Sequence, residues 1–218
     1  MWVALYTALL PGMAKAQILG ANFNELPKNV DPVLLDDSRT TWVRGFFEML
    51  DLAGQANLAT NSNVLGMQRA ADAGRELVVS FKWNFDGAGQ SVPAPGSLQE
   101  QQLFDLAVDT LNAIDRPVNT IVLGNEPMWE TPTADLQRPA PGQRSPLANF
   151  TERLLDHVDA TYSEQQPARP KYFLGALNRL DQPANQQKDV VQDFFDMART
   201  NPKIAGMDLH VHYNGIAQ

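Results

Sequence analysis

The feature that most limits the fold of this chain is a regular alternation of short apolar runs with longer segments of helical periodicity. Strand-like runs rich in β-branched and aromatic residues lie at 18–23, 41–47, 76–85, 120–124, 171–176 and 207–213. Helical segments separate most of them, and one carries apolar residues at three- and four-residue spacing, namely Leu103, Leu106, Ala107, Leu111 and Ile114. Strands that alternate with helices form βαβ units around a parallel sheet, so the sequence predicts an α/β fold.

Composition narrows the class of protein. The chain has 218 residues, of which 44% are hydrophobic and 19% charged, and this balance favours one globular domain with a sizeable core. The formal net charge is −8 and no basic cluster is present, so we expect no nucleic-acid partner. The chain has no cysteine, which excludes disulfides and thiolate metal sites.

The N-terminus suggests export. Residues 2–13 form a short apolar stretch, and Ala14-Lys15-Ala16 follows it as a small-x-small pattern. This arrangement resembles a signal peptide over 1–16, cleaved before a domain at 17–218, and predicts a secreted protein. The stretch is shorter than the roughly 20 apolar residues that span a bilayer, so we expect no membrane partner. Because a basic n-region is missing, a buried N-terminal segment remains the alternative.

The fourth strand-like run ends in the most informative motif of the chain. Ile121, Val122 and Leu123 are followed by Gly124, and Pro127 then prevents the strand from continuing. Glu126 therefore follows the carboxyl end of a strand, which is the edge where parallel α/β folds carry their ligands. The alternative is that Asn125 and Glu126 form an ordinary solvated turn.

Side-chain alternation indicates where other polar groups point. In a barrel, one set of strand residues faces the helices and the other faces the interior. The interior set gathers polar residues on three strands: Arg44 and Glu48 on the second, Ser80, Lys82 and Asn84 on the third, and Asp208, His210 and His212 on the sixth. Loops at 86–96 and 129–144 are expected to overhang the same edge, with Glu130 solvated in the second loop.

Six residues together resemble the active-site pattern of the clan A glycoside hydrolases. These are retaining enzymes with a (β/α)8 TIM-barrel fold, and their fourth strand ends in Asn-Glu-Pro or a close variant. The six residues are Arg44, Asn125, Glu126, His210, His212 and Tyr213. The resemblance implies that Glu126 is the general acid/base, that Asn125 binds the sugar 2-hydroxyl, and that Arg44 holds the nucleophile ionised. The H-V-H-Y run at 210–213 is similar to the His/Tyr element of the sixth strand. The family spacing is typically His-x-Tyr, so the sequence leaves open which of the two histidines fills this role.

The chemistry agrees with these roles. A retaining glycosidase uses two carboxyl groups about 5–5.5 Å apart, one of which must remain protonated near neutral pH. The resemblance implies a carbohydrate substrate and no cofactor. Trp129, directly after the motif, is a candidate for stacking on a sugar ring. Lys82 and Asn84 either bind substrate or satisfy interior carboxylates.

The sequence departs from the family because it stops shortly after the sixth run. In the family the seventh strand carries the nucleophilic glutamate, and a complete barrel takes about 250 residues. We therefore expect an incomplete barrel of about six βα units that holds the acid/base half and is inactive by itself. Two alternatives remain. One is a non-catalytic carbohydrate-binding degenerate barrel, and the other is a metal-dependent TIM-barrel hydrolase with His210, His212 and Asp208 as ligands.

Overall fold

The structure is a computed structural model that describes residues 20–23, 40–82, 90–178, 180 and 182–210. Its centre is a six-stranded parallel sheet in the order β1-β2-β3-β4-β5-β6. The strands are β1 Gly20–Phe23, β2 Trp42–Glu48, β3 Glu76–Lys82, β4 Thr120–Leu123, β5 Lys171–Asn178 and β6 Ile204–His210. The longer helices are α3 Ser62–Asp72, α4 Leu98–Ile114, α7 Pro146–Thr161 and α9 Asp189–Thr200. Shorter helical segments are α2 Met49–Ala53, η1 Leu58–Thr60, α5 Pro127–Glu130, α6 Thr133–Leu136, η2 Ser163–Gln165 and α8 Pro183–Gln186.

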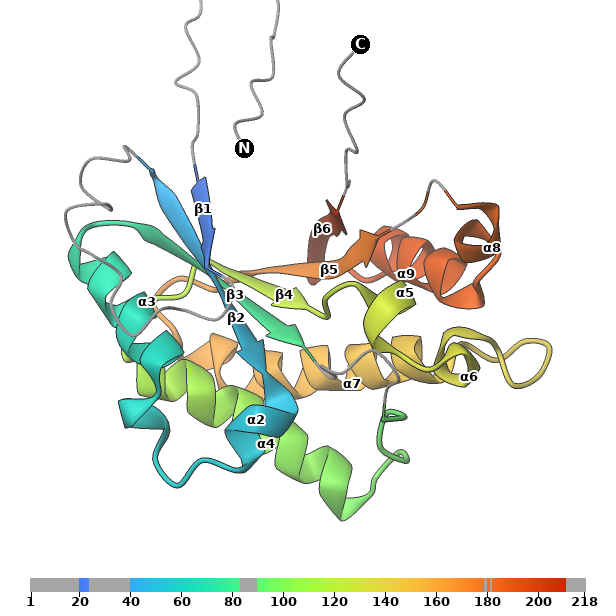
Figure 1. Cartoon of the computed structure of the whole chain (residues 1–218), viewed down its shortest axis with the longest axis horizontal. Helices are drawn as coiled ribbons and strands as arrows, with labels where there is room; N and C mark the ends of the chain where they lie inside the picture. The colour runs from blue at the N-terminus through green and yellow to red at the C-terminus, as the bar shows by residue number, and fades with distance from the viewer. Residues whose placement is uncertain (1–19, 24–39, 83–89, 179, 181, 211–218) are drawn as a thin grey trace, which may run out of the picture.

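The strand order explains why the helices form a single layer. Crossovers between parallel strands are almost always right-handed, so a sheet that grows in one direction places every connecting helix on the same side. Figure 1 shows α3, α4 and α7 together along one face of the sheet, with α9 beside β5 and β6. A doubly wound sheet would reverse its order and carry helices on both faces. The α/β fold is therefore confirmed, and its parallel sheet is consistent with part of a (β/α)8 TIM barrel.

The hydrophobic core lies between the sheet and this helix layer. Leu77, Val79 and Phe81 of β3 are fully buried there, as the alternation predicts. Phe104 of α4 and Phe150 of α7 join the two neighbouring helices, with ring centroids 5.3 Å apart. The helix side of β3 is thus used for packing.

The inner face of the sheet carries an open hollow of about 470 Å³. Its lining mixes aromatic, aliphatic and charged side chains from five strands, and includes Trp42, Arg44, Val78, Val122, Phe173 and Asp208. Its charged members are Arg44 and Asp208, which alternation places on the inner face, together with Glu76 of β3 and Lys171 of β5. The first residues of β2, β3, β4 and β5 line the hollow, so it lies towards the amino ends of these strands, and Arg44 and Asp208 connect it to the candidate site.

Several boundaries differ from the sequence prediction. β6 begins at Ile204 rather than 207, and β5 continues to Asn178 rather than ending at 176. The expected loop at 129–144 is partly wrong, because the end of α5 and all of α6 lie within it. Pro127 is the first residue of α5, where its fixed φ suits a helix, and Pro132 immediately precedes α6. Asn84, His212, Tyr213 and the leader at 1–16 lie outside the described residues, and their roles stay predictions.

None of the helices in the described part of the chain has the length and apolar character needed to cross a membrane.

Candidate active site

Glu126 lies at the carboxyl end of β4 in an unusual backbone conformation. Its φ of 38° and ψ of 53° place it in the left-handed region, which costs a non-glycine residue about 1–2 kcal/mol. Pro127 contributes, because a following proline disfavours the right-handed helical region. The Glu126 N–H donates to the Ala176 carbonyl at 2.9 Å, and the Glu126 carbonyl accepts from Trp129 N–H at 2.8 Å. Contacts with β5 and α5 therefore hold a strained backbone that fixes the direction of the carboxyl group.

The Glu126 carboxyl group pairs with a histidine from another strand. His210 Nδ1 lies 2.8 Å from Glu126 Oε1, and about a fifth of each side chain is exposed. A neutral imidazole can donate or accept through a ring nitrogen, depending on its tautomer. The pair is therefore accessible to a substrate, and it provides a partner for either protonation state of the carboxyl group.

Arg44 lies on the other side of His210. Its Nη1 is 2.6 Å from Asp208 Oδ2 and 3.5 Å from His210 Nε2, and its Nε donates to Ser80 Oγ at 2.7 Å. The guanidinium carbon also lies 4.7 Å from the centre of the Phe46 ring. Burial lowers the pKa of Arg44, while the charge of Asp208 opposes that shift. Arginine side chains stay protonated in proteins even when their pKa is lowered, so Arg44 supplies a fixed positive charge.

The structure thus brings together three residues that the family resemblance groups in one site. A continuous chain of polar contacts runs from Arg44 on β2, through His210 on β6, to Glu126 after β4. Asp208 joins it through Arg44. Arg44 Nη2 is buried and has no hydrogen-bond partner among the described residues. This nitrogen retains the capacity to bind one more acceptor.

Asn125, one residue before Glu126, belongs to a second polar cluster. Its side chain is buried, and its Nδ2 donates to Glu130 Oε1 at 2.7 Å. Lys82 Nζ lies 3.4 Å from Glu130 Oε1 and 3.3 Å from Glu48 Oε1. One ammonium group therefore balances two carboxyl groups from α5 and β2. Asn125 Oδ1 is buried and finds no partner within the described part of the chain.

The expectation that Glu130 is solvated is wrong, since only 6% of it is exposed. Pro127 starts the single turn of α5, and Glu130 is the buried last residue of that turn. Burial raises the pKa of Glu130 to about 7, although Lys82 and Asn125 act in the opposite direction. Burial also raises the pKa of Glu48.

The remaining candidates are placed as follows. Trp129 is 53% exposed on α5, so its ring is accessible. Asn178 was missed by sequence reasoning, and it pairs in register with His210 at the end of β5. It is only 1% exposed, and neither of its amide atoms has a partner in the region that the structure describes. The predicted strand ended too early to include it.

The described residues contain no group of three or more His, Cys, Asp or Glu side chains that could hold a metal ion. His212, one of the ligands in the metal-dependent alternative, lies outside them.

Comparison with known proteins gives a fold. No protein-family model matches the chain, and no curated protein matches it in sequence. Among solved structures, a fungal beta-1,4-galactanase superposes with a TM-score of 0.51 at 18% sequence identity. The match covers 82% of this chain and 54% of the galactanase, so the chain spans about half the length of that structure. At this identity the likeness shows the fold, an α/β architecture with a parallel sheet consistent with part of a TIM barrel.

Proposed function

We propose that this chain is the acid/base half of an O-glycosyl hydrolase, which cleaves β-glycosidic bonds in a poly- or oligosaccharide by a retaining mechanism with two carboxyl groups. The observation that carries the proposal is Glu126, held in a strained conformation at the carboxyl end of β4 with His210 Nδ1 at 2.8 Å. The likeness to a beta-1,4-galactanase, which acts on carbohydrate, supports the class of substrate.

Glu126 is proposed as the general acid/base. In the first step its carboxylic acid gives a proton to the departing glycosidic oxygen, and in the second its carboxylate takes a proton from water. The same group must therefore be stable in both protonation states. His210 suits this requirement, because its ring nitrogen is able to accept from the acid and donate to the carboxylate.

Arg44 is proposed to stabilise the second carboxylate. Its charge favours an ionised neighbour, and its buried Nη2 has no partner among the described residues, so it offers a donor to one more anionic oxygen. We assign the nucleophile to no described residue. The family resemblance would place it on a seventh strand.

The proposed substrate contacts are residues around this edge of the sheet. They are Asn125 for the 2-hydroxyl, Trp129 for a sugar face, and Lys82, Asn84, His210, His212 and Tyr213 for further hydroxyl groups. We also propose that residues 1–16 are a secretion signal, that 17–218 belong to the catalytic domain, and that the protein acts outside the cell.

The product anomer tests this function. The full-length protein is incubated with β-1,4-galactan and other β-linked glycans while the anomeric protons are followed by NMR. The proposal expects the β-anomer to form first, and a Glu126→Gln variant to release far less sugar. First release of the α-anomer would contradict the retaining mechanism, and no release from any β-linked substrate would contradict the hydrolase.

A second candidate is a carbohydrate-binding protein without catalysis. The observation that favours it is the hollow on the inner face of the sheet, where aromatic Trp42 and Phe173 line a space of about 470 Å³. Binding of an oligosaccharide by the folded chain, with no hydrolysis by the full-length protein, would establish this alternative.

A further inference from the structure

The contact between Asn125 and Glu130 defines which way the asparagine amide points. The nitrogen and oxygen ends of an asparagine amide have nearly the same shape, so the neighbouring groups decide its orientation. An ionised carboxylate only accepts hydrogen bonds, and Glu130 Oε1 lies 2.7 Å from Asn125 Nδ2. This neighbour therefore selects the orientation with the nitrogen towards Glu130.

Lys82 supports the ionised form of Glu130. Its Nζ lies 3.4 Å from Glu130 Oε1, and an adjacent ammonium charge favours a carboxylate over a carboxylic acid. The other charged groups that face Glu130 are Glu48 on β2, which shares Lys82, and Glu126 one turn earlier. Burial opposes ionisation of Glu130 most strongly and Glu126 adds to it, while Lys82 and Asn125 favour the carboxylate.

The orientation leaves Asn125 with binding capacity. One of its two amide N–H groups is used by Glu130, and its Oδ1 has no partner in the described part of the chain. A second N–H and a carbonyl oxygen remain, which is one donor beside one acceptor. A sugar hydroxyl needs this combination, because it donates one hydrogen bond and accepts others.

We propose that Glu130 is a positioning residue that fixes the Asn125 amide, so that Asn125 presents a defined donor and acceptor to a substrate hydroxyl. The identity of that hydroxyl as part of a sugar rests on the proposed function. Glu130 itself is buried and acts through Asn125, so it is not assigned a role at the reacting atoms.

The first test observes the amide directly and needs no substrate. The side-chain N–H signals of Asn125 are followed by ¹⁵N NMR from pH 5 to 9 in the wild-type chain, in Glu130→Gln and in Glu100→Gln. Glu100 is a matched control, since it is also a buried glutamate, but it binds Gly96 N–H and Arg153 away from this cluster. The proposal expects the Asn125 signals to titrate with Glu130 in the wild type and in Glu100→Gln, and to lose this titration in Glu130→Gln. Signals that behave identically in all three proteins would overturn it.

The second test measures selectivity in the full-length protein. Aryl β-glycosides with and without the 2-hydroxyl are compared for the wild type, Glu130→Gln, Asn125→Ala, the double variant and Glu100→Gln. We expect Glu130→Gln to reduce the preference for the 2-hydroxyl about tenfold, which is the loss of one well-oriented hydrogen bond. The double variant should lose no more preference than Asn125→Ala alone, because both changes affect one interaction.

These outcomes separate the two proposals. Additive losses of preference, or a preference unchanged in Glu130→Gln, would overturn the positioning role while leaving the hydrolase proposal intact. Absence of activity in the wild type would count against the hydrolase, and the NMR titration would still decide whether Glu130 fixes the Asn125 amide.

Discussion

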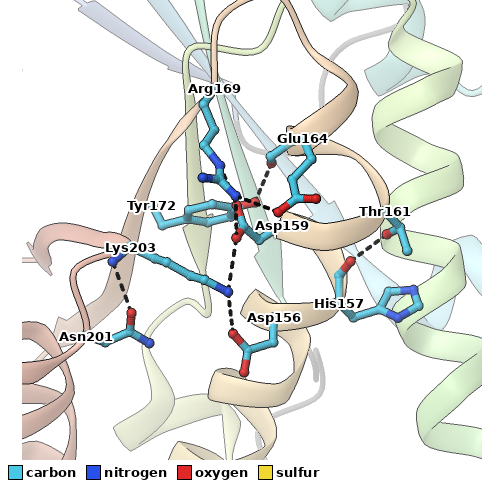
Figure 2. Close-up of polar contacts among 10 residues, drawn as sticks. Asp156, His157, Asp159, Thr161, Glu164, Arg169, Tyr172, Asn201 and Lys203 are labelled. Atoms are coloured by element: carbon cyan, nitrogen blue, oxygen red, sulfur yellow. Dashed lines mark hydrogen bonds and ion pairs between the residues drawn. The ribbon is translucent and has the colours of Figure 1, made fainter.

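Buried carboxyl groups lie at both ends of the sheet, but their hydrogen-bond and ion-pair partners differ between the two ends. At the amino end, Asp159 is only 1% exposed, and Figure 2 shows Arg169 and Lys203 converging on it. Arg169 binds both carboxylate oxygens at 2.9 and 2.8 Å, and Lys203 Nζ lies 3.1 Å from Oδ2. The buried Tyr172 hydroxyl lies 2.5 Å from Ser163 Oγ. The acidic and phenolic groups of this cluster all have partners.

The carboxyl end leaves part of its polar capacity unused. Arg44 Nη2, Asn125 Oδ1 and Glu130 Oε2 are buried, and none has a hydrogen-bond partner in the described residues. Each such group costs about 1–3 kcal/mol relative to a partnered one. A strained backbone at Glu126 adds to this cost.

The difference shows how a binding site can be recognised among buried ionic clusters. Burial of charge alone does not mark function, because Asp159 is buried more deeply than Arg44 and Glu130 of the candidate site. Completed partners indicate a role in stability, whereas unused donors and acceptors at one edge indicate a place for a ligand. The predictions that follow test this division by perturbing each end in turn.

Apart from replacement of Glu126 itself, the largest expected effect is on activity and follows from Arg44→Met. This change removes the fixed charge beside Asp208 and His210, and loss of such an electrostatic group typically reduces kcat about 100-fold or more. The measurement is kcat/KM of the full-length protein for a β-glycoside, corrected for the folded fraction. Wild-type activity in this variant would remove Arg44 from the site.

The next effect is a pH dependence of stability that originates in Glu130. Its pKa is raised from 4.5 to about 7 in the folded protein, so the folded state holds its proton more tightly than the unfolded state. Its contribution to stability is fully present below pH 4.5 and is lost as pH rises through about 7. The shift corresponds to about 3 kcal/mol in the free energy of unfolding.

Urea unfolding at a series of pH values measures this contribution. Glu130→Gln should flatten the decline in stability between pH 4.5 and 7, and Glu100→Gln should leave it in place. A decline that is the same in Glu130→Gln and the wild type would assign it to another group.

A smaller effect, confined to stability, is expected at the opposite end of the sheet. Asp159→Asn removes the charge shared by Arg169 and Lys203, and since both cations are partly exposed we expect a loss of about 2 kcal/mol rather than the 3–5 of a fully buried pair. Chemical denaturation measures this loss, and kcat/KM per folded molecule should not change. Reduced activity of the folded variant would contradict the assignment of a purely stabilising role to the amino end of the sheet.

The smallest expected effect follows from Ser163→Ala. The variant leaves the buried Tyr172 hydroxyl without its 2.5 Å contact, at a cost of about 1 kcal/mol in the free energy of unfolding. A Tyr172→Phe, Ser163→Ala double variant should recover part of that loss, because it removes both polar groups together. If the double variant is less stable by the sum of the two single losses, the contact carries no interaction energy.

The sheet and the position of Glu126 could be predicted from local patterns. Parallel strands buried on both faces give continuous apolar runs, and Gly124 and Pro127 mark where the fourth one ends. Alternation along β2 and β6 then assigned Arg44 and His210 to the inner face, where the structure places them. These features depend only on neighbours in sequence.

The parts that could not be predicted depend on contacts between distant strands or on very short elements. The pairing of Arg44 with Asp208 joins β2 to β6, which no local pattern encodes. α5 is too short to show helical periodicity, so the burial of Glu130 was missed. The end of β5 at Asn178 is set by its pairing with β6, which contains register shifts. A strand end fixed by its neighbour leaves little trace in its own sequence.

The most direct test of the central claim, that Glu126 is the general acid/base, is the dependence of the rate on the leaving group. The full-length protein and its Glu126→Gln variant are compared on aryl β-glycosides whose leaving groups range from strongly to weakly acidic phenols. The account predicts a loss of about 10²–10⁴-fold in kcat/KM for the poorest leaving groups and a much smaller loss for the best, which depart without a proton. Equal activity of the two proteins on the poorest leaving groups would contradict it.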